Sequence, residues 1–246
     1  MTDRSSDLAV VVGAGGGVGG ALLHVLAAQS RYERLIGLGR RRPADWPSDA
    51  NWTFVEADIT DEEQIAHAAG VVAAQGRPAR VVVATGLLHG QGVSPEKTMR
   101  ALDGAVLQQL FAVNAIGPAL VAKHFLPLAP RDRPSVFAAL SARVASLSDN
   151  RLGGWYGYRA SKAALNMLIA TLAVEHRRTH PLGVCAALHP GTVETRLSAP
   201  FPDRSATPAR RLSPGQSAQA LVRVMDGLQP SDSGRFFAWD GQAIDW

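Results

Sequence analysis

The feature that most constrains the fold is a glycine-rich turn that joins a short apolar run to an amphipathic segment. Residues 8–12 are rich in valine and predict a buried strand, and residues 18–29 predict a helix. Between them the chain reads GAGGGVGG, residues 13–20. Such a turn lets the backbone approach a ligand, and the N-terminus of the following helix stabilises negative charge. This order predicts a nucleotide-binding α/β fold.

The alternation of apolar runs and amphipathic segments continues to the end of the chain. Further strands are predicted over residues 35–38, 52–55, 80–84, 135–140, 184–188 and 235–239, and helices over 62–75, 107–126, 155–176 and 214–228. An irregular loop rich in proline, serine and arginine covers residues 192–212. Strands that alternate with helices favour a doubly wound parallel sheet with helices on both faces. We therefore expect one Rossmann-type α/β domain over residues 1–246, with about seven strands.

Composition and charge limit the classes of protein to consider. With 46% hydrophobic and 19% charged residues the chain has the composition of an ordinary globular protein, and no apolar run approaches the roughly 20 residues of a membrane span. The net charge of +4 is spread out except at residues 40–42 and 210–211, without the basic stripe of a nucleic-acid-binding protein. The single cysteine, Cys185, lies in an apolar run and is expected to be a buried thiol in a reducing cytosol. We expect a cytoplasmic protein with no nucleic-acid partner, no membrane partner and no metal site.

The glycine turn fits two nucleotide-binding patterns. These are Gly15-x-Gly17-x-x-Gly20 and Gly13-x-x-x-Gly17-x-Gly19, of which the second begins directly after the predicted strand. In doubly wound sheets ligands bind beyond the carboxyl ends of the strands, where this turn lies. The turn alone indicates a nucleotide, and a glycine-rich turn without a ligand is the alternative.

Three arginines, residues 40–42, follow the second predicted strand. An acidic residue there commonly binds the ribose 2′-hydroxyl of NAD, whereas an arginine accommodates the 2′-phosphate of NADP. The first acidic residue after this strand is Asp45. Guanidinium groups match phosphate in geometry and charge. The sequence therefore predicts that NADP(H) is preferred over NAD(H), mainly through Arg40, and a solvated basic loop is the alternative.

Two further positions fit the adenosine part of such a cofactor. Asp58 follows the third predicted strand, where a carboxylate can accept a hydrogen bond from the adenine amino group. An Asp-x-Thr sequence before a helix is also a capping signal, which is the alternative for Asp58. Gly86 follows the fourth predicted strand and would let the backbone pass close to the ribose.

The stretch GGWYGYRASKAAL, residues 153–165, places Tyr158 and Lys162 four residues apart at the start of a predicted helix. This spacing puts the phenol and the ammonium on one face of the helix, one turn apart. Such a pair on a solvated helix commonly has no chemical role, so the rest of the chain must decide. Tyr156 has Ala160 at the same spacing, and we expect it to serve packing or to line a pocket.

The order of these features resembles the short-chain dehydrogenase/reductase family. After the glycine turn come Asp58, Gly86, Asn114, Ser141, Tyr158 and Lys162, and HPGTVET, residues 189–195, follows the sixth predicted strand. The likeness covers essentially the whole chain. Within the family, SARVASLSDNRLGGWYGYRASKAALNM and DSGRFFAWDG are most similar to the C-factor-like group.

The resemblance implies roles for the catalytic residues. Tyr158 is expected to be the general acid that protonates a carbonyl oxygen as hydride reaches the carbon. Lys162 is expected to favour the phenolate through its positive charge and to hold the nicotinamide ribose. Asn114 is expected at a break in the long helix, where it organises a water chain to Lys162. Gly117 and Pro118, just after it, favour such a distortion.

The resemblance also implies a cofactor site, formed by Gly13, Gly17, Val18, Gly19, Arg40, Asp58, Ile59, Gly86, Val193 and Thr195 together with Tyr158 and Lys162. The backbone of Val193 and the hydroxyl of Thr195 are expected to meet the nicotinamide carboxamide and a nearby phosphate. For this last segment a proline turn without a ligand is the alternative.

The chain departs from the family pattern at several positions. The catalytic serine of the family commonly lies thirteen residues before the tyrosine, where this chain has Ala145. Ser141 and Ser146 are the remaining candidates, and we favour Ser141 because it directly leaves the fifth predicted strand. Val12 replaces a threonine, and VATG, residues 83–86, replaces Asn-Asn-Ala-Gly, which removes polar groups from the floor of the cofactor site.

Together these features predict an NADP(H)-dependent oxidoreductase that interconverts a small apolar ketone or aldehyde and an alcohol. The pocket is expected to be lined by GLLHG, GGWYG and LSAPFP, and the helices over 107–126 and 155–176 to form a homodimer or homotetramer. One alternative is a dinucleotide-binding protein of the C-factor type with a role in cell-to-cell signalling or regulation, and another is an oligomeric scaffold. Tyr158, Lys162 and Asn114 favour the enzyme, because a pure binder needs no proton transfer.

Overall fold

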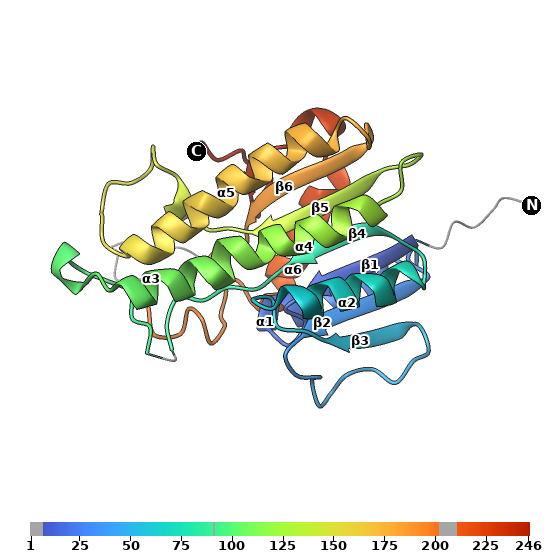
Figure 1. Cartoon of the computed structure of the whole chain (residues 1–246), viewed down its shortest axis with the longest axis horizontal. Helices are drawn as coiled ribbons and strands as arrows, with labels where there is room; N and C mark the ends of the chain where they lie inside the picture. The colour runs from blue at the N-terminus through green and yellow to red at the C-terminus, as the bar shows by residue number, and fades with distance from the viewer. Residues whose placement is uncertain (1–6, 91, 202–210) are drawn as a thin grey trace, which may run out of the picture.

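The computed structural model describes residues 7–90, 92–201 and 211–246, in which seven parallel strands form one sheet in the order β3-β2-β1-β4-β5-β6-β7 (Figure 1). The strands are β1 (Asp7–Val12), β2 (Arg34–Gly39), β3 (Trp52–Glu56), β4 (Arg77–Val83), β5 (Ser135–Leu140), β6 (Gly183–His189) and β7 (Phe236–Ala238). The order reverses between β1 and β4, and doubly wound sheets bind ligands at such a switch point. The predicted Rossmann-type fold is confirmed.

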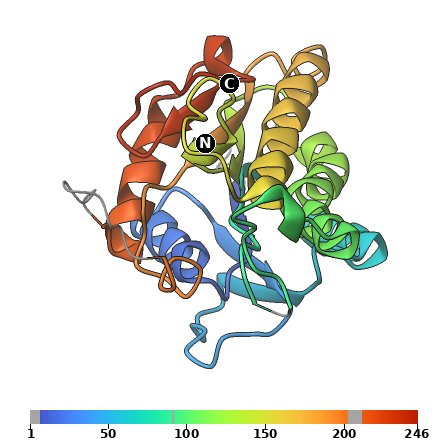
Figure 2. The ribbon, with the colours of Figure 1, turned by 90° about the vertical axis from the view of Figure 1, so that its left-hand side faces the viewer.

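Helices cover both faces of the sheet (Figure 2). One layer holds α1 (Gly17–Ala28) and α6 (Pro214–Gly227), and the other holds α2 (Glu62–Ala73), α4 (Gly117–Phe125) and α5 (Tyr156–His176). Alternate residues of each strand face opposite layers, and in β1 Val10 packs towards α2, α4 and α5 whereas Val11 packs towards α1 and α6. Both faces of the sheet are therefore buried, which explains why the strands read as nearly continuous apolar runs.

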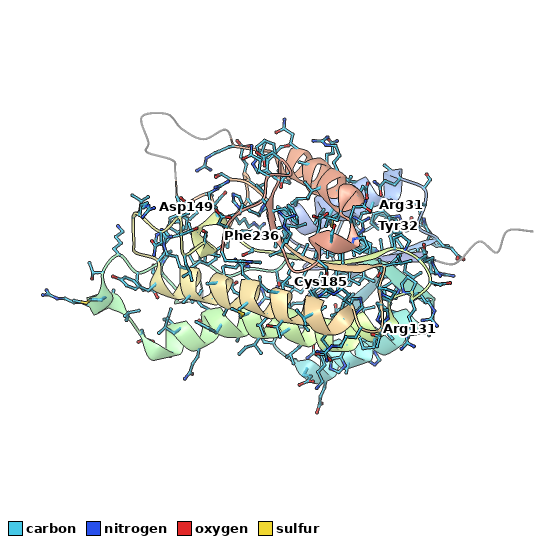
Figure 3. The ribbon with its side chains drawn as sticks, turned by 90° about the horizontal axis from the view of Figure 1, so that it is seen from above. Arg31, Tyr32, Arg131, Asp149, Cys185 and Phe236 are labelled. Atoms are coloured by element: carbon cyan, nitrogen blue, oxygen red, sulfur yellow. The ribbon has the colours of Figure 1, made fainter. Side chains whose placement is uncertain are left out.

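Cys185 lies in β6, between the two helix layers (Figure 3). The residue is fully buried, and burial raises the pKa of its thiol to about 12. A thiol with such a pKa is not a reactive nucleophile at neutral pH, because the thiolate is the reactive form. The prediction of a buried structural cysteine is confirmed.

The long helix on this side of the sheet is more complex than predicted. It comprises α3 (Gly104–Phe111), a π-helical turn (Ala112–Ile116), α4 and a 3-10 turn (Leu126–Leu128). By length and composition alone the 25-residue stretch Gly104–Leu128 could cross a membrane, so the expectation that no apolar run approaches that length was wrong. Proline normally interrupts a helix, but Pro118 occupies the first turn of α4, directly after the π turn, and the helix continues. The stretch packs as a core helix, since Val121, Ala122 and Phe125 are fully buried against the sheet.

Three helix starts follow local capping signals, whereas the start of α5 does not. Asp61 caps α2 by accepting from Gln64 N, Asp103 caps α3, and Ser213 forms a capping box with Gln216 at α6. Helix α5 begins after Trp155, which has a left-handed backbone and provides no side-chain cap. The start of α5 is therefore held by other parts of the chain.

Two predicted boundaries need comment. Strand β4 begins at Arg77 rather than at residue 80, because Pro78 lies at the point where the register with β1 shifts and does not interrupt the ladder. The predicted loop over 192–212 and the segment LSAPFP extend into residues 202–210, which lie outside the described residues, as does Arg210.

The C-terminal end of α5 carries a buried pair of histidines. The rings of His176 and His180 stack with their centroids 4.2 Å apart. Burial, followed by the charge of His180, lowers the pKa of His176 to about 4, whereas an unfolded histidine has a pKa of about 6.5. Between these values the unfolded chain binds more protons than the folded chain, so the free energy of unfolding decreases as the pH falls.

We expect His176→Gln to reduce the loss of stability between pH 6.5 and pH 4. For one titrating group this loss is at most about 1.4 kcal/mol per pH unit. His189, whose pKa burial also lowers to about 4, retains part of the dependence. Urea unfolding at pH 7 and pH 4.5 measures the effect, with the exposed His67→Gln as the control. An equal pH dependence in the His176 variant and the wild type would contradict this interpretation.

Candidate active site

The loops that follow β1, β4, β5 and β6 gather beyond the carboxyl ends of the strands, on the left of Figure 1 and facing the viewer in Figure 2. The glycine turn follows β1, which lies beside the central strand β4. Gly13 has a φ of 90°, and a Cβ at this position would lie 3.0 Å from the main-chain carbon of Ala84. The amides of Gly13 and Ala14 both donate to the carbonyl of Leu38, at 2.8 and 3.0 Å. A Cβ on Gly19 would clash with the carbonyl oxygen of Gly13. Glycine is therefore required at positions 13 and 19.

The same turn leads into a helix start suited to an anion. Gly16 is the N-cap of α1 and offers no side-chain cap, and the first turn holds no acidic residue. The amides of Gly17, Val18 and Gly19 are the first of the helix and have no intrahelical acceptor. A Cβ on Gly17 would lie 3.1 Å from Cγ2 of Thr195, so the predicted Thr195 faces the glycine turn. This arrangement fits the pyrophosphate of a dinucleotide.

The segment after β6 is held beside the turn by its own hydrogen bonds. Val193 is buried and pairs with Leu212 in a parallel bridge. The hydroxyl of Ser198 donates to the carbonyls of Val193 and Thr195, and it accepts from Thr195 N at 3.2 Å. Val193 and Thr195 are thus fixed at the edge of the candidate cofactor site.

Arg40 and Asp58 lie at the ends of the neighbouring strands β2 and β3. Arg40 is exposed, and its charge acts on Asp58. Burial raises the pKa of Asp58, but two hydrogen bonds from Thr60 and the charge of Arg40 together hold it below the ordinary value. Asp58 does not cap α2, because Asp61 does so. Its neighbour Ile59 is buried below the site.

Tyr158, Lys162, Asn114 and Gly86 come together at the carboxyl ends of β4 and β5. Lys162 is 2% exposed and donates from Nζ to the carbonyl of Leu140, the last residue of β5, at 2.8 Å. A Cβ on Gly86 would lie 3.8 Å from both Lys162 Nζ and Asn114 Oδ1. Tyr158 lies one turn before Lys162 and is 8% exposed. The structure therefore places these four predicted residues around one point.

Asn114 lies in the π turn, so the predicted break in the long helix is present at this residue. Its Oδ1 accepts from Leu87 N at 2.8 Å, and its Nδ2 donates to Leu87 O at 2.8 Å and to Ser161 Oγ at 3.1 Å. Ser161 Oγ in turn donates to the carbonyl of Tyr158 at 2.9 Å. Asn114 thus joins the loop after β4 to the first turn of α5. Its expected water chain to Lys162 stays a prediction.

Burial shifts the pKa values of Tyr158 and Lys162. It raises the pKa of Tyr158 to about 12 and lowers the pKa of Lys162 to about 7. Burial disfavours the charged form of each group, and the expectation that the charge of Lys162 favours the phenolate stays a prediction. At neutral pH Tyr158 is therefore protonated, which is the form that a proton donor requires.

Neither candidate serine has a hydroxyl bonded to Tyr158. Ser141 directly follows β5, as predicted, and its hydroxyl donates to Asn166 Oδ1 at 2.6 Å. The hydroxyl of Ser146 lies 3.1 Å from that of Ser148 and accepts from Asp149 N, within its own loop. Ser141 is the nearer to Lys162, since it follows Leu140. A catalytic role for Ser141 stays a prediction.

Two buried residues of the site were not found from the sequence. Thr85, within VATG, has a buried hydroxyl without a hydrogen-bond partner, and its Cγ2 lies 3.1 Å from the position of a Cβ on Gly13. The floor of the site therefore retains one hydroxyl, that of Thr85. Glu96 is buried beside the start of α5, and its loop offers no pattern that indicates this. Tyr156 is 39% exposed, so it is not a packing residue of the core.

Comparison with known proteins decides the family. The family described as short chain dehydrogenase matches residues 7–205 of this chain. The chain belongs to the short-chain dehydrogenase family. Its glycine turn, Asn114, Tyr158 and Lys162 are the residues on which this resemblance was predicted, and that prediction is confirmed.

Several known proteins are similar to the chain. The C-signal of Myxococcus xanthus is 38% identical over 146 residues, which cover 59% of this chain and 81% of the relative. The 1-hydroxy-2-glutathionyl-2-methyl-3-butene dehydrogenase of Rhodococcus sp. (strain AD45) is 31% identical over 77% of this chain and 78% of the relative. The structure of an NADPH-bound carbonyl reductase from chicken fatty liver has a TM-score of 0.84 at 24% identity, covering 99% of this chain and 95% of that one. That structural likeness concerns the fold.

Proposed function

We propose that this short-chain dehydrogenase is an NADP(H)-dependent oxidoreductase that interconverts a small apolar ketone or aldehyde and the corresponding alcohol. The observation that carries the proposal is the position of Lys162 and Asn114 beside Gly86, one helical turn from Tyr158, beyond the carboxyl ends of β4 and β5. A binding protein would need the glycine turn but not a buried phenol and amine one helical turn apart. The name of the Rhodococcus relative, a dehydrogenase, agrees with this class of reaction.

Tyr158, Lys162 and Asn114 have different roles in the proposed reaction. The bound nicotinamide would supply hydride to the carbonyl carbon. Tyr158 gives its proton to the carbonyl oxygen and regains one from solvent, so that the carbonyl gains two hydrogen atoms in total. Lys162, in its protonated form, stabilises the phenolate that Tyr158 leaves behind. Asn114 holds the loop after β4 against α5 and so fixes the floor beneath both groups.

The cofactor is proposed to be held by the glycine turn, Thr195, Asp58 and Arg40, with the pyrophosphate at the amides of Gly17 to Gly19. Two observations support a dinucleotide at this place: the close approach of three strands at Gly13, and the orphaned hydroxyl of Thr85 beside it. The exposed Arg40, which lies where the adenosine ribose is expected, supports NADP(H). The chicken liver carbonyl reductase of the same fold binds NADPH.

A screen of carbonyl compounds with NADPH and NADH, and of alcohols with NADP⁺ and NAD⁺, tests the proposal through nicotinamide absorbance. We expect initial rates of alcohol oxidation to rise with pH, by up to about tenfold per unit until Lys162 begins to lose its own proton near pH 7, because the phenolate is the base in that direction and the charge of Lys162 stabilises it. Carbonyl reduction should show no such rise, because it needs the protonated phenol. A lack of turnover with every carbonyl and alcohol would overturn the proposal.

A signalling or regulatory role is the second candidate. The 38% identity to the C-signal of Myxococcus xanthus favours it. The two candidates differ in what they require, since signalling by a cofactor-bound protein would not need the proton of Tyr158. We also propose a cytoplasmic location, which cell fractionation would test.

We expect the protein to form a homodimer or homotetramer through the outer side of the layer that holds α4 and α5. Ile116, Met167 and Val174 lie there with exposed fractions of 52–68%. Large apolar side chains gathered on one surface favour an interface. Light scattering at micromolar concentration should give a multiple of 26.0 kDa, and Met167→Glu should shift it towards the monomer. Arg223→Glu on the exposed side of α6 is the control, and a wild type that is monomeric would contradict the prediction.

A further inference from the structure

The turn before α5 has a rare backbone conformation. Gly153, Gly154 and Trp155 are consecutive and have φ values of 61°, 66° and 52°. Two glycines adopt this left-handed region readily, but for a bulky residue such as tryptophan it is strained. A strained residue persists only where its surroundings hold it in place. Trp155 is also the N-cap of the helix that carries Tyr158.

Glu96, from the loop after β4, forms hydrogen bonds with the last residue of this turn and with the start of α5. Its main-chain carbonyl accepts from Trp155 N at 2.5 Å, and its buried carboxylate accepts from Gly157 N at 3.2 and 3.3 Å. The carboxylate thus replaces the missing side-chain cap of α5, and its negative charge suits a helix N-terminus. Gly157 is needed for this approach, since a Cβ there would lie 2.8 Å from Glu96 Oε1.

Arg159, from α5, forms hydrogen bonds with the two glycines of the turn. Its guanidinium donates to the carbonyls of Gly154 at 3.0 Å, Gly153 at 3.2 Å and Val144 at 3.2 Å. The turn is therefore held by the carboxylate of Glu96 on one side and by the guanidinium of Arg159 on the other. This exceeds what is needed to begin a helix, because α2, α3 and α6 each begin with one local capping residue.

The conformation of Trp155 determines where its ring lies. The ring packs edge-on against Tyr158 at 6.2 Å between centroids and against Phe201 at 5.1 Å, and Phe201 in turn packs against His89 at 5.4 Å. His89 Nε2 lies 3.0 and 3.1 Å from the carbonyls of Arg196 and Leu197. The loops after β4 and β6 thus meet Trp155 in one aromatic cluster beside the phenol.

We propose that Glu96 is a positioning residue that holds Trp155 in its left-handed conformation, and that Trp155 is a specificity-determining residue against which a flat apolar group of the substrate packs. This rests on the proposed function, because a carbonyl that accepts the proton of Tyr158 carries its substituent past the ring next to Tyr158. The ring faces favour a planar substituent, as in an aryl aldehyde, over a short alkyl chain.

Enzyme kinetics with benzaldehyde and propanal as probes test the proposal at saturating NADPH. We expect Trp155→Leu to lower the ratio of kcat/KM for benzaldehyde over that for propanal by about threefold to tenfold. Glu96→Ala should lower kcat for benzaldehyde by roughly 10- to 100-fold, with the Kd of NADPH unchanged, and Glu96→Gln, which retains an acceptor for Gly157 N, should recover most of this loss. Glu63→Ala, at an exposed position of α2, is the control. An unchanged substrate ratio in Trp155→Leu, or full activity in Glu96→Ala, would overturn the proposal.

A second readout needs no turnover. The chain contains five tryptophans, so ¹⁹F NMR of the fluorotryptophan-labelled protein should give five resonances, of which Trp155→Phe identifies one. Glu96→Ala should shift this resonance and leave the other four, whereas Glu96→Gln should leave all five. A resonance of Trp155 that is unmoved in Glu96→Ala would overturn the role of Glu96. If the wild type turns over no carbonyl compound or alcohol, the proposed function fails, while the NMR result still decides whether Glu96 positions Trp155.

Discussion

Replacement of Tyr158 by phenylalanine is expected to lower turnover by roughly a hundred- to ten-thousandfold, the usual contribution of a positioned general acid. Phenylalanine retains the ring that packs beside Trp155 and removes only the hydroxyl that supplies the proton. The Kd of NADPH should therefore change by less than about threefold. Steady-state kinetics of both directions and a fluorescence titration with NADPH measure the two quantities.

Tyr156→Phe is a matched control for this variant. It removes the same atom two residues earlier on the helix, from a side chain that is 39% exposed and has no lysine one turn later. Its turnover should stay close to that of the wild type. Equal losses in the two variants would mean that the hydroxyl of Tyr158 supports the structure only. A Tyr158→Phe protein that retains turnover would contradict the proposed mechanism.

Replacement of Arg40 by aspartate is expected to weaken NADPH far more than NADH. A hydrogen bond to a charged group contributes about 1.5–3 kcal/mol, which corresponds to about one to two decades in Kd. The aspartate removes the guanidinium and would also repel the 2′-phosphate, while it could accept a hydrogen bond from the ribose hydroxyl of NADH. The Kd of each cofactor for wild type and variant measures the change in preference.

Arg223→Asp on α6 is the control for the change in net charge. Arg223 is an exposed residue of α6, so this variant should retain the wild-type ratio of the two dissociation constants. If the two arginine variants reduce NADPH affinity equally, the effect is a general one of charge. If the wild type binds NADH as tightly as NADPH, residues 40–42 are a solvated basic loop.

The sequence was sufficient to predict the order of strands and helices along the chain, because most strands are buried on both faces and most turns carry their own signal. The glycine turn is a good example, since Gly13 and Gly19 are required by contacts within the turn and its neighbouring strands. The long helix through Pro118 was predicted with its break at Asn114, but the partners of Asn114 were not predictable in the same way. The π turn aligns Asn114 with Leu87 and Ser161, which are distant in sequence.

The candidate site was predictable only where its residues follow strands or share a helix face. Tyr158 and Lys162 satisfy the second condition, and Gly86 and Ser141 the first. Glu96 satisfies neither, because it acts on α5 from a loop of irregular sequence. The effect of burial on Tyr158 and Lys162 could not be predicted either, since their pKa values depend on what surrounds them in the folded chain.

Transfer of deuterium from the cofactor tests the central claim most directly. The purified protein is incubated with NADPH that carries deuterium at both positions of C4 of the nicotinamide and with an aldehyde or ketone that is turned over, and the product is examined by mass spectrometry and NMR. We predict an alcohol that carries one deuterium on the former carbonyl carbon, formed by the wild type and by Tyr156→Phe but not by Tyr158→Phe. Formation of the alcohol without deuterium at that carbon, or equal formation by the Tyr158 variant, would contradict the proposed function.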